Sequence, residues 1–274
     1  MILLFLLLYL SYTPHMFQKK AHILLIQFRQ TAITAELELA SISRELGSGI
    51  TINVQSALES DVDWTKPREM LAKYDGAIFG GSGDFDFDGS REKHDPARLM
   101  SYILVERLRP LIQYIFDYNV PTLGICYGHQ LLGAFSGVII KHDETQRKTR
   151  SHTVRLLADS SNTFLCSNLP KNFKAQYGHK DVLERVPDGA TLLIEGGDEC
   201  QVSALCYSDV IFSTQFHPEL NLEDMQKRVE ATPGYLPEGV SVEEVFEDSP
   251  DANIILKNFG ELVVRHCNES GEVR

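Results

Sequence analysis

A cysteine between two glycines stands at the centre of the stretch PTLGICYGHQLLG, residues 121–133. An apolar run precedes Cys126 and a helix-like run follows it, which predicts a strand, a sharp turn and a helix. Such a nucleophile elbow needs small neighbours, and Gly124 and Gly128 supply them. The start of the helix would favour the thiolate, and the N–H of Tyr127 could hold an oxyanion. Taken alone, the pattern also fits a buried cysteine in a glycine-containing turn.

A candidate base for this cysteine lies in TQFHPEL, residues 214–220. His217 and Glu219 stand two apart at the end of an apolar run, and residues i and i+2 of an extended strand face the same side. Pro218 between them stiffens the segment. Glu219 could therefore hold His217 in one tautomer while His217 faces the thiol. An isolated H-x-E is usually a surface accident, so the pair gains its meaning from the elbow.

The glycine-rich segment FGGSGDF, residues 79–85, follows a predicted strand. Backbone N–H groups in such a loop can bind an anion. The segment lacks the G-x-x-x-x-G-K-[ST] pattern of a nucleotide-binding P-loop. We therefore expect it to supply a second oxyanion donor, the N–H of Gly81, and a plain turn is the alternative.

In combination, GICYGHQ, QFHPE and the upstream GGS resemble the class I glutamine amidotransferases, a Cys-His-Glu family. The likeness is strongest to the amidotransferase domain of GMP synthase and its stand-alone relatives, and it covers roughly residues 20–265. It implies a γ-glutamyl thioester on the cysteine and release of ammonia or an amine. The roles that it implies are these: Cys126 as nucleophile, His217 as base, Glu219 as orienter, Gly81 and Tyr127 as oxyanion donors, and Gln130 as a contact of the bound glutamine.

The segment that begins GHKD, residues 178–190, resembles the family's S-H-G-D segment. The resemblance implies that its backbone grips the α-amino and α-carboxylate groups of glutamine, with His179 at the matching position. Gly178 stands where the family has serine, and Lys180 stands where it has glycine. The lysine could reach a different substrate carboxylate or point to solvent.

The elements that must position these residues alternate between strands and helices. Strand-like runs occur at 21–28, 51–58, 75–79 and 120–126, with helix-like runs between and after them: 34–47, 67–74, 96–119 and 128–137. This order predicts an open, mostly parallel sheet with helices on both faces and reactive groups at the carboxyl ends of the strands. Strand-like segments crowd together after residue 138, which predicts a small antiparallel or mixed segment. The whole matches the flavodoxin-like fold that the resemblance implies.

Composition narrows the class of protein further. The 274 residues carry a net charge of −12, which disfavours a nucleic-acid surface. The apolar start is too short for a bilayer span and lacks the basic leader of a signal peptide. We therefore expect residues 1–15 to be a leader or upstream-start extension, with a secretion signal as the alternative, and residues 16–274 to form a single domain. No membrane association is expected.

The cysteines and histidines indicate neither a disulfide framework nor a metal site. Five cysteines without a CxxC pair fit a reducing, cytoplasmic location. The histidines form no HExxH pair, and the acidic segment DFDFDG, residues 84–89, lacks the further ligands of a calcium loop. We expect that segment to be a mobile flap near the site, and we expect no cofactor.

Three functional classes remain open. The first is a glutaminase that passes ammonia to a separate synthetase partner. The second is a stand-alone hydrolase or transferase that acts on γ-glutamyl peptides. The third is a non-catalytic binding protein on the same scaffold, which an intact Cys, His and Glu set disfavours.

Overall fold

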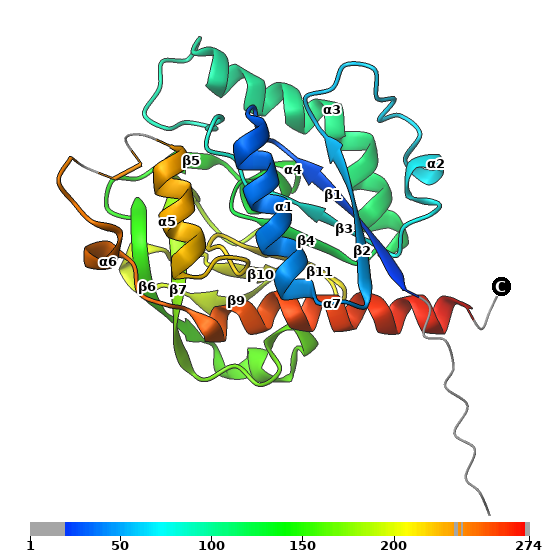
Figure 1. Cartoon of the computed structure of the whole chain (residues 1–274). Coiled ribbons are helices and arrows are strands. Elements are labelled where there is room, and N and C mark those ends of the chain that lie inside the picture. Colours follow the sequence, from blue (N-terminus) through cyan, green and yellow to red (C-terminus); the bar gives the residue numbers. More distant parts are fainter. Residues whose placement is uncertain (1–19, 233–234, 237, 272–274) are drawn as a thin grey trace, which may run out of the picture.

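The computed structural model describes residues 20–232, 235–236 and 238–271 (Figure 1). The expected leader, residues 1–15, lies outside them. The strands of the described part are β1 (Ala21–Gln27), β2 (Ile50–Ser56), β3 (Gly76–Phe79), β4 (Thr122–Ile125), β5 (Ile140–His142), β6 (Lys148–Leu156), β7 (Asn172–His179), β8 (Asp181–Leu183), β9 (Thr191–Glu195), β10 (Ala204–Cys206) and β11 (Ile211–Thr214). The helices are α1 (Ala32–Leu46), α2 (Pro67–Leu71), α3 (Pro96–Tyr118), α4 (Tyr127–Phe135), α5 (Leu222–Ala231), α6 (Val242–Val245) and α7 (Pro250–Gly271).

The central sheet has the strand order β2-β1-β3-β4-β11-β10-β9-β6-β7. The first five strands pair in parallel, and β10, β9, β6 and β7 continue the sheet in antiparallel fashion. The predicted open, mostly parallel sheet is confirmed. The antiparallel strands extend this same sheet, and β5 and β8 form a separate two-stranded sheet. Strands β7 and β8 and helices α5 and α6 were not predicted from the sequence.

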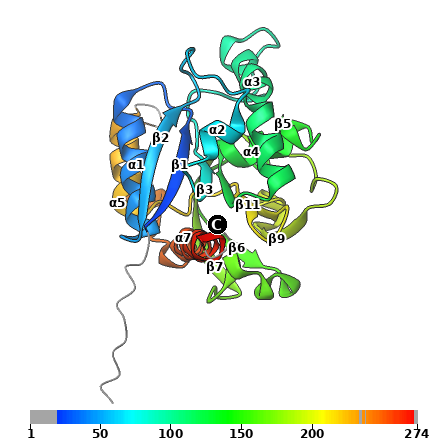
Figure 2. The same cartoon turned by 90° about the vertical axis from the view of Figure 1, so that its right-hand side faces the viewer.

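Helices cover both faces of the sheet, as Figure 2 shows from the side: α1, α5 and α7 lie on one face, and α3 and α4 lie on the other. The central strands β3, β4 and β11 are buried along their whole length. Such uninterrupted burial is typical of parallel strands covered on both faces. The edge strand β2 is only half-buried.

The loops that leave the carboxyl ends of the four neighbouring strands β1, β3, β4 and β11 meet at one edge of the sheet. Open α/β sheets bind their ligands at this edge. These loops carry Arg29, Gly81, Cys126 and His217. Helix α5 packs beside α1 (Figure 1) and brings further side chains, among them Arg228, to the same edge.

Candidate active site

Cys126 occupies a strained turn between β4 and α4, with φ 53° and ψ −98°. Non-glycine residues adopt such angles only where their surroundings force them to. Its N–H donates to the carbonyl of Thr214 in β11 (2.7 Å), and the N–H of Gly128 donates to the carbonyl of Gly80 (3.0 Å). A Cβ at Gly124 would lie 2.7 Å from the carbonyl oxygen of Gly128, and one at Gly128 would overlap the carbonyl of Phe79. The predicted elbow and its need for both glycines are therefore present.

The pair His217 and Glu219 lies just beyond β11, where both side chains are buried. Nδ1 of His217 is 2.7 Å from Oε1 of Glu219, a hydrogen bond. The two residues were expected on an extended strand, and this expectation was wrong. The strand ends at Thr214, the N–H of His217 donates to the carbonyl of Gln176 in β7 (2.9 Å), and Glu219 lies in a turn. The turn, not strand periodicity, brings the carboxylate back to the imidazole.

Charges around the pair hold both residues ionised. Burial alone would lower the pKa of His217, but the charges and hydrogen bonds of Glu219 and Cys126 outweigh it and raise that pKa to about 9. Burial would raise the pKa of Glu219, but His217 and then Arg228 lower it to about 2. An imidazolium between a carboxylate and a sulfur is the electrostatic arrangement that activates a thiol.

The N–H of Gly81 points to a different group from the one expected. It donates to Oε1 of Glu38 in α1 (2.9 Å), and not toward an oxyanion beside the sulfur. Glu38 is buried and also accepts from Nη2 of Arg29 (2.7 Å) and from Nε2 of Gln27 (3.1 Å). Gly81 nevertheless lies close to the imidazole of His217, because a Cβ on this glycine would be 3.2 Å from Cε1 of that ring.

Tyr127 is the first residue of α4, so its N–H has no acceptor within the helix. Its backbone adjoins Cys126 directly, while its side chain packs in the core against the ring of Phe28. In this conformation the N–H of Tyr127 is therefore available beside the thiol as a donor to an oxyanion.

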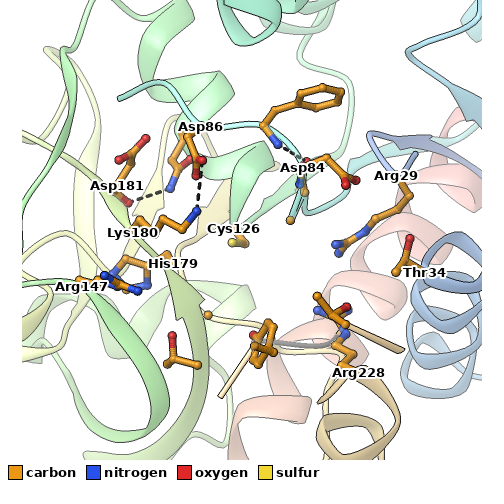
Figure 3. A pocket seen from close by; sticks show the side chains of 18 of the residues that line it. Arg29, Thr34, Asp84, Asp86, Cys126, Arg147, His179, Lys180, Asp181 and Arg228 are labelled. Carbon is orange, nitrogen blue, oxygen red and sulfur yellow. Dashed lines mark hydrogen bonds and ion pairs between the residues drawn. The ribbon is translucent and has the colours of Figure 1, made fainter. Parts of the chain in front are cut away.

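A cavity of about 270 Å³ opens above Cys126. Figure 3 shows the thiol between two groups of side chains: Lys180, His179, Arg147, Asp86 and Asp181 on one side, and Arg29, Thr34, Asp84 and Arg228 on the other. Gln130 also lines the cavity, and its Nε2 donates to the carbonyl of Asp181 (2.8 Å). The side-chain amide of Gln215, which was not singled out from the sequence, lies 3.7 Å from Sγ of Cys126.

The GHKD segment lines the same cavity. A Cβ on Gly178 would overlap the hydroxyl of Tyr235, which gives a physical reason why glycine stands at this position. His179 is buried, its Nε2 lies 2.9 Å from the carbonyl of Gln146, and burial lowers its pKa to about 3. The side chain of Lys180 is 39% exposed, and its Nζ pairs with Asp86 at 3.3 Å (Figure 3).

The acidic segment at 84–89 forms a wall of the cavity and is fixed to the GHKD segment. The buried carboxylate of Asp181 accepts the N–H groups of Asp88 (2.8 Å) and Gly89 (2.7 Å). Together with the Lys180–Asp86 pair, these bonds tie the wall down at several points. In the described part of the chain, no group of three or more His, Cys, Asp or Glu side chains is arranged to hold a metal ion.

Four further residues of the site were not found from the sequence: Arg29, Glu38, Arg228 and Tyr235. Nη2 of Arg228 donates to Oε1 of Glu219 (3.0 Å), and the ring of Tyr235 lines the cavity beside Gly178. These residues follow no short motif. Glu38 and Arg228 look like members of the solvated faces of α1 and α5, and Arg29 looks like an ordinary loop residue. Only the folded chain shows that the three side chains are largely buried.

The fold and the elbow define an α/β protein with a cysteine at the carboxyl edge of a mixed sheet, beside a buried His-Glu pair. The family model described as "Glutamine amidotransferase class-I" matches residues 45–232. The chain therefore belongs to the class I glutamine amidotransferase family. This confirms the resemblance on which the sequence interpretation was based.

Individual relatives agree with this assignment. The chain is 32% identical over 117 residues to a glutamine-hydrolysing GMP synthase subunit of Methanocaldococcus jannaschii, with 42% of this chain and 60% of that protein covered. It is 30% identical over 182 residues to the corresponding GMP synthase subunit of Picrophilus torridus, with 65% and 80% covered. The match to the GMP synthase of Dehalococcoides mccartyi, at 30% identity, covers 53% of this chain but only 22% of that protein.

The fold recurs in a solved structure, a glutamine amidotransferase from Thermotoga maritima. The TM-score is 0.63 at 18% sequence identity, over 89% of this chain and 98% of that one. Among the described residues, no helix is both long and apolar enough to span a bilayer.

Proposed function

We propose that the chain cleaves the γ-amide of glutamine or of another γ-glutamyl amide through a thioester on Cys126. One observation carries the proposal: the strained cysteine and the buried His217–Glu219 pair lie together at the carboxyl edge of the sheet, with Cys126 on the cavity wall. A nucleophile, a base and an orienter in contact are the minimum that acyl transfer requires. The family membership supports this reaction class.

In the proposed mechanism, the thiolate of Cys126 attacks the γ-carbonyl carbon. The N–H of Tyr127 stabilises the oxyanion, a contribution that typically amounts to about 3 kcal/mol per donor. His217 gives its proton to the leaving amine and then activates the water that hydrolyses the thioester, while Glu219 holds the imidazole. The N–H of Gly81 becomes a second donor only when it leaves Oε1 of Glu38.

The side of the cavity that carries Lys180 and Asp86 is proposed to bind the α-amino and α-carboxylate groups of the substrate. Lys180 and Asp86 place a cation and a carboxylate 3.3 Å apart on its wall. A glutamyl group carries the complementary α-carboxylate and α-ammonium, so both partners can exchange their ion pair for contacts with substrate. Gln130, Gly178 and His179 also line the cavity and set its shape.

We propose two functions for this reaction and give the favoured one first. The first is delivery of ammonia to a separate synthetase partner, and relatives named as subunits of GMP synthase support it. The second candidate is a stand-alone γ-glutamyl peptide hydrolase or transferase. It is supported by the departure from S-H-G-D at Gly178 and Lys180, because a changed grip suits a changed substrate. Neither reaction needs a cofactor.

The test is a comparison of two cysteine variants on purified full-length protein. Cys126→Ala is expected to abolish release of glutamate from glutamine and from γ-glutamyl peptides, whereas Cys206→Ala, at a half-buried thiol of β10, should stay within twofold of wild type. Stimulation of glutamine turnover by a cell extract would support the ammonia-delivering function. Partner-independent turnover of γ-glutamyl peptides would support the second candidate. Full activity in Cys126→Ala would end the proposal.

A further inference from the structure

The carboxylate of Glu219 is shared between two cationic side chains. Its Oε1 lies 2.7 Å from Nδ1 of His217 and accepts Nη2 of Arg228 at 3.0 Å. The carboxylate side chain is 1% exposed and that of Arg228 is 11% exposed, so both are largely shielded from water. Oε2 of Glu219 is buried and has no hydrogen-bond partner among the described residues. The orientation of this carboxylate therefore depends on the two bonds to Oε1.

Arg228 reaches Glu219 because α5 is held firmly against α1. Asn221 caps the start of the helix, and its side chain and that of Asp224 accept each other's backbone N–H groups. Arg44 of α1 donates to both carboxylate oxygens of Asp224, at 3.0 and 2.7 Å, and to the carbonyl of Glu219 at 2.8 Å. Arginines from two helices thus hold the backbone and the side chain of the same residue.

We propose that Arg228 is a positioning residue of the reaction, which keeps the Glu219 carboxylate ionised and turned toward His217. A buried carboxylate is stable as an anion only when it is paired and hydrogen-bonded. With Arg228 in place, the carboxylate accepts from Nδ1 of His217 and leaves the other imidazole nitrogen to serve Cys126. The inference rests on the proposed function, because it assigns a role within the same catalytic set.

Arg228 acts on the imidazole through charge as well as geometry. Arg228 helps to keep the Glu219 carboxylate ionised, so its removal should weaken the counter-charge of the His217 imidazolium, which then stabilises the Cys126 thiolate less. Several other groups face the His217–Glu219 pair and stay in place when Arg228 is changed: Cys126, His179, Arg29, Glu38 and Tyr235. A change in pH dependence after substitution of Arg228 alone is therefore attributable to that residue.

A merely structural or substrate-binding role would give different results. If Arg228 only helped α5 to dock, its loss would lower stability and leave the pH dependence of the thiol unchanged. If its guanidinium, which also lines the cavity, only bound substrate, its loss would raise KM and spare kcat. A positioning role predicts a fall in kcat at nearly constant KM, together with a shifted pH profile.

The experiment compares R228Q and R228K with a matched control, K227Q, in the full-length protein. Lys227 is the neighbouring residue of α5, and its side chain is 48% exposed and pairs only with Glu223 in the described part of the chain. Turnover is measured with L-glutamine and γ-glutamyl-p-nitroanilide. Alkylation of Cys126 by iodoacetamide is followed by mass spectrometry from about pH 5 to about pH 10, a measurement that needs no substrate.

For R228Q we expect kcat to fall roughly 10- to 100-fold with KM within about threefold, as for a misplaced catalytic group. The midpoint of alkylation should move upward by roughly half to one pH unit. R228K, which keeps the charge, should retain the wild-type midpoint with an intermediate kcat, and K227Q should match wild type in both. If R228Q does not fold, the kinetics of R228K decide: an intermediate kcat at nearly constant KM supports the role, and a wild-type kcat or a raised KM alone overturns it.

In R228Q, a wild-type kcat, a raised KM alone, or a reduced kcat with an unmoved alkylation midpoint would each overturn the positioning role. Failure of the proposed function looks different. In that case the wild-type protein turns over neither compound, while the alkylation profiles of the variants still report whether Arg228 acts on the Cys126–His217 pair.

Discussion

Two buried neutral histidines should make this protein sensitive to mild acid. His129 of α4 is completely buried, and its Nδ1 lies 2.7 Å from the hydroxyl of Ser213 in β11. His179 at the end of β7 is 4% exposed. Burial disfavours the imidazolium of each and lowers the pKa of both side chains to about 3. In the unfolded chain a histidine titrates near about pH 6.5.

Linkage gives the sign and size of the effect. Between pH 3 and 6.5 the unfolded state binds a proton at each histidine that the folded state does not, so stability falls as the pH falls. From pH 7 to pH 5 each histidine lowers the free energy of unfolding by about 2 kcal/mol. His217 opposes this loss, because its pKa is raised and its stabilising contribution is complete only below pH 6.5. That opposing contribution is about 1 kcal/mol over the same interval, so the net loss is about 3 kcal/mol.

The assay is guanidinium chloride unfolding at pH 7 and pH 5 for wild type and His129→Asn. The side-chain amide of asparagine can keep the bond to Ser213 but takes up no proton in this range. Whatever the variant costs at pH 7, its further loss on going to pH 5 should be about 2 kcal/mol smaller than that of wild type. His94→Asn, at an exposed histidine, is the matched control and should keep the full wild-type loss. An unchanged pH-dependent loss in His129→Asn would refute the reasoning.

Two further substitutions test the elbow and the loop beside it. Gly128→Ala places a Cβ onto the carbonyl of Phe79 and should lower kcat about 100-fold by displacing the thiol, whereas Gly49→Ala, with open space around its Cβ, should leave steady-state kinetics unchanged. Glu38→Gln leaves the guanidinium of Arg29 buried without its counter-charge and should lower the free energy of unfolding by about 3–5 kcal/mol in denaturant titrations. Adding Arg29→Gln should restore part of that loss, and strict additivity of the two changes would contradict the pairing.

The elbow could be predicted from the sequence because its requirements are local. A strand, a turn and a helix each have their own sequence pattern, and the small residues at 124 and 128 are needed within five positions of one another. The sequence also pointed to the contact between His217 and Glu219 for a similar reason, since two residues so close in the chain can meet in several backbone conformations. The extended strand assumed for them was wrong, yet the contact exists.

The surroundings of the site could not be predicted, because they depend on packing between distant elements. Glu38 lies on a helix face that reads as polar, and only the docking of α1 on the sheet buries it against Arg29 and the Gly81 loop. Arg228 sits on α5, a helix that was not predicted at all. Charge patterns on a helix favour a solvated face unless the tertiary structure supplies a partner.

In the proposed mechanism, the two buried arginine–glutamate pairs have opposite consequences for catalysis. Arg228 leaves Oε1 of Glu219 directed at His217, so its pairing supports the base. Arg29 holds Glu38 where it accepts the N–H of Gly81, so its pairing withholds an oxyanion donor. Helix α1, which carries Glu38, and helix α5, which carries Arg228, are joined by the Arg44–Asp224 ion pair. A shift of α1 relative to the sheet would therefore act on both: it would move Glu38 away from Gly81, and through Arg44 it would pull on the backbone of Glu219. Under the proposed function, completion of the oxyanion site and alignment of the base are therefore linked through helices α1 and α5.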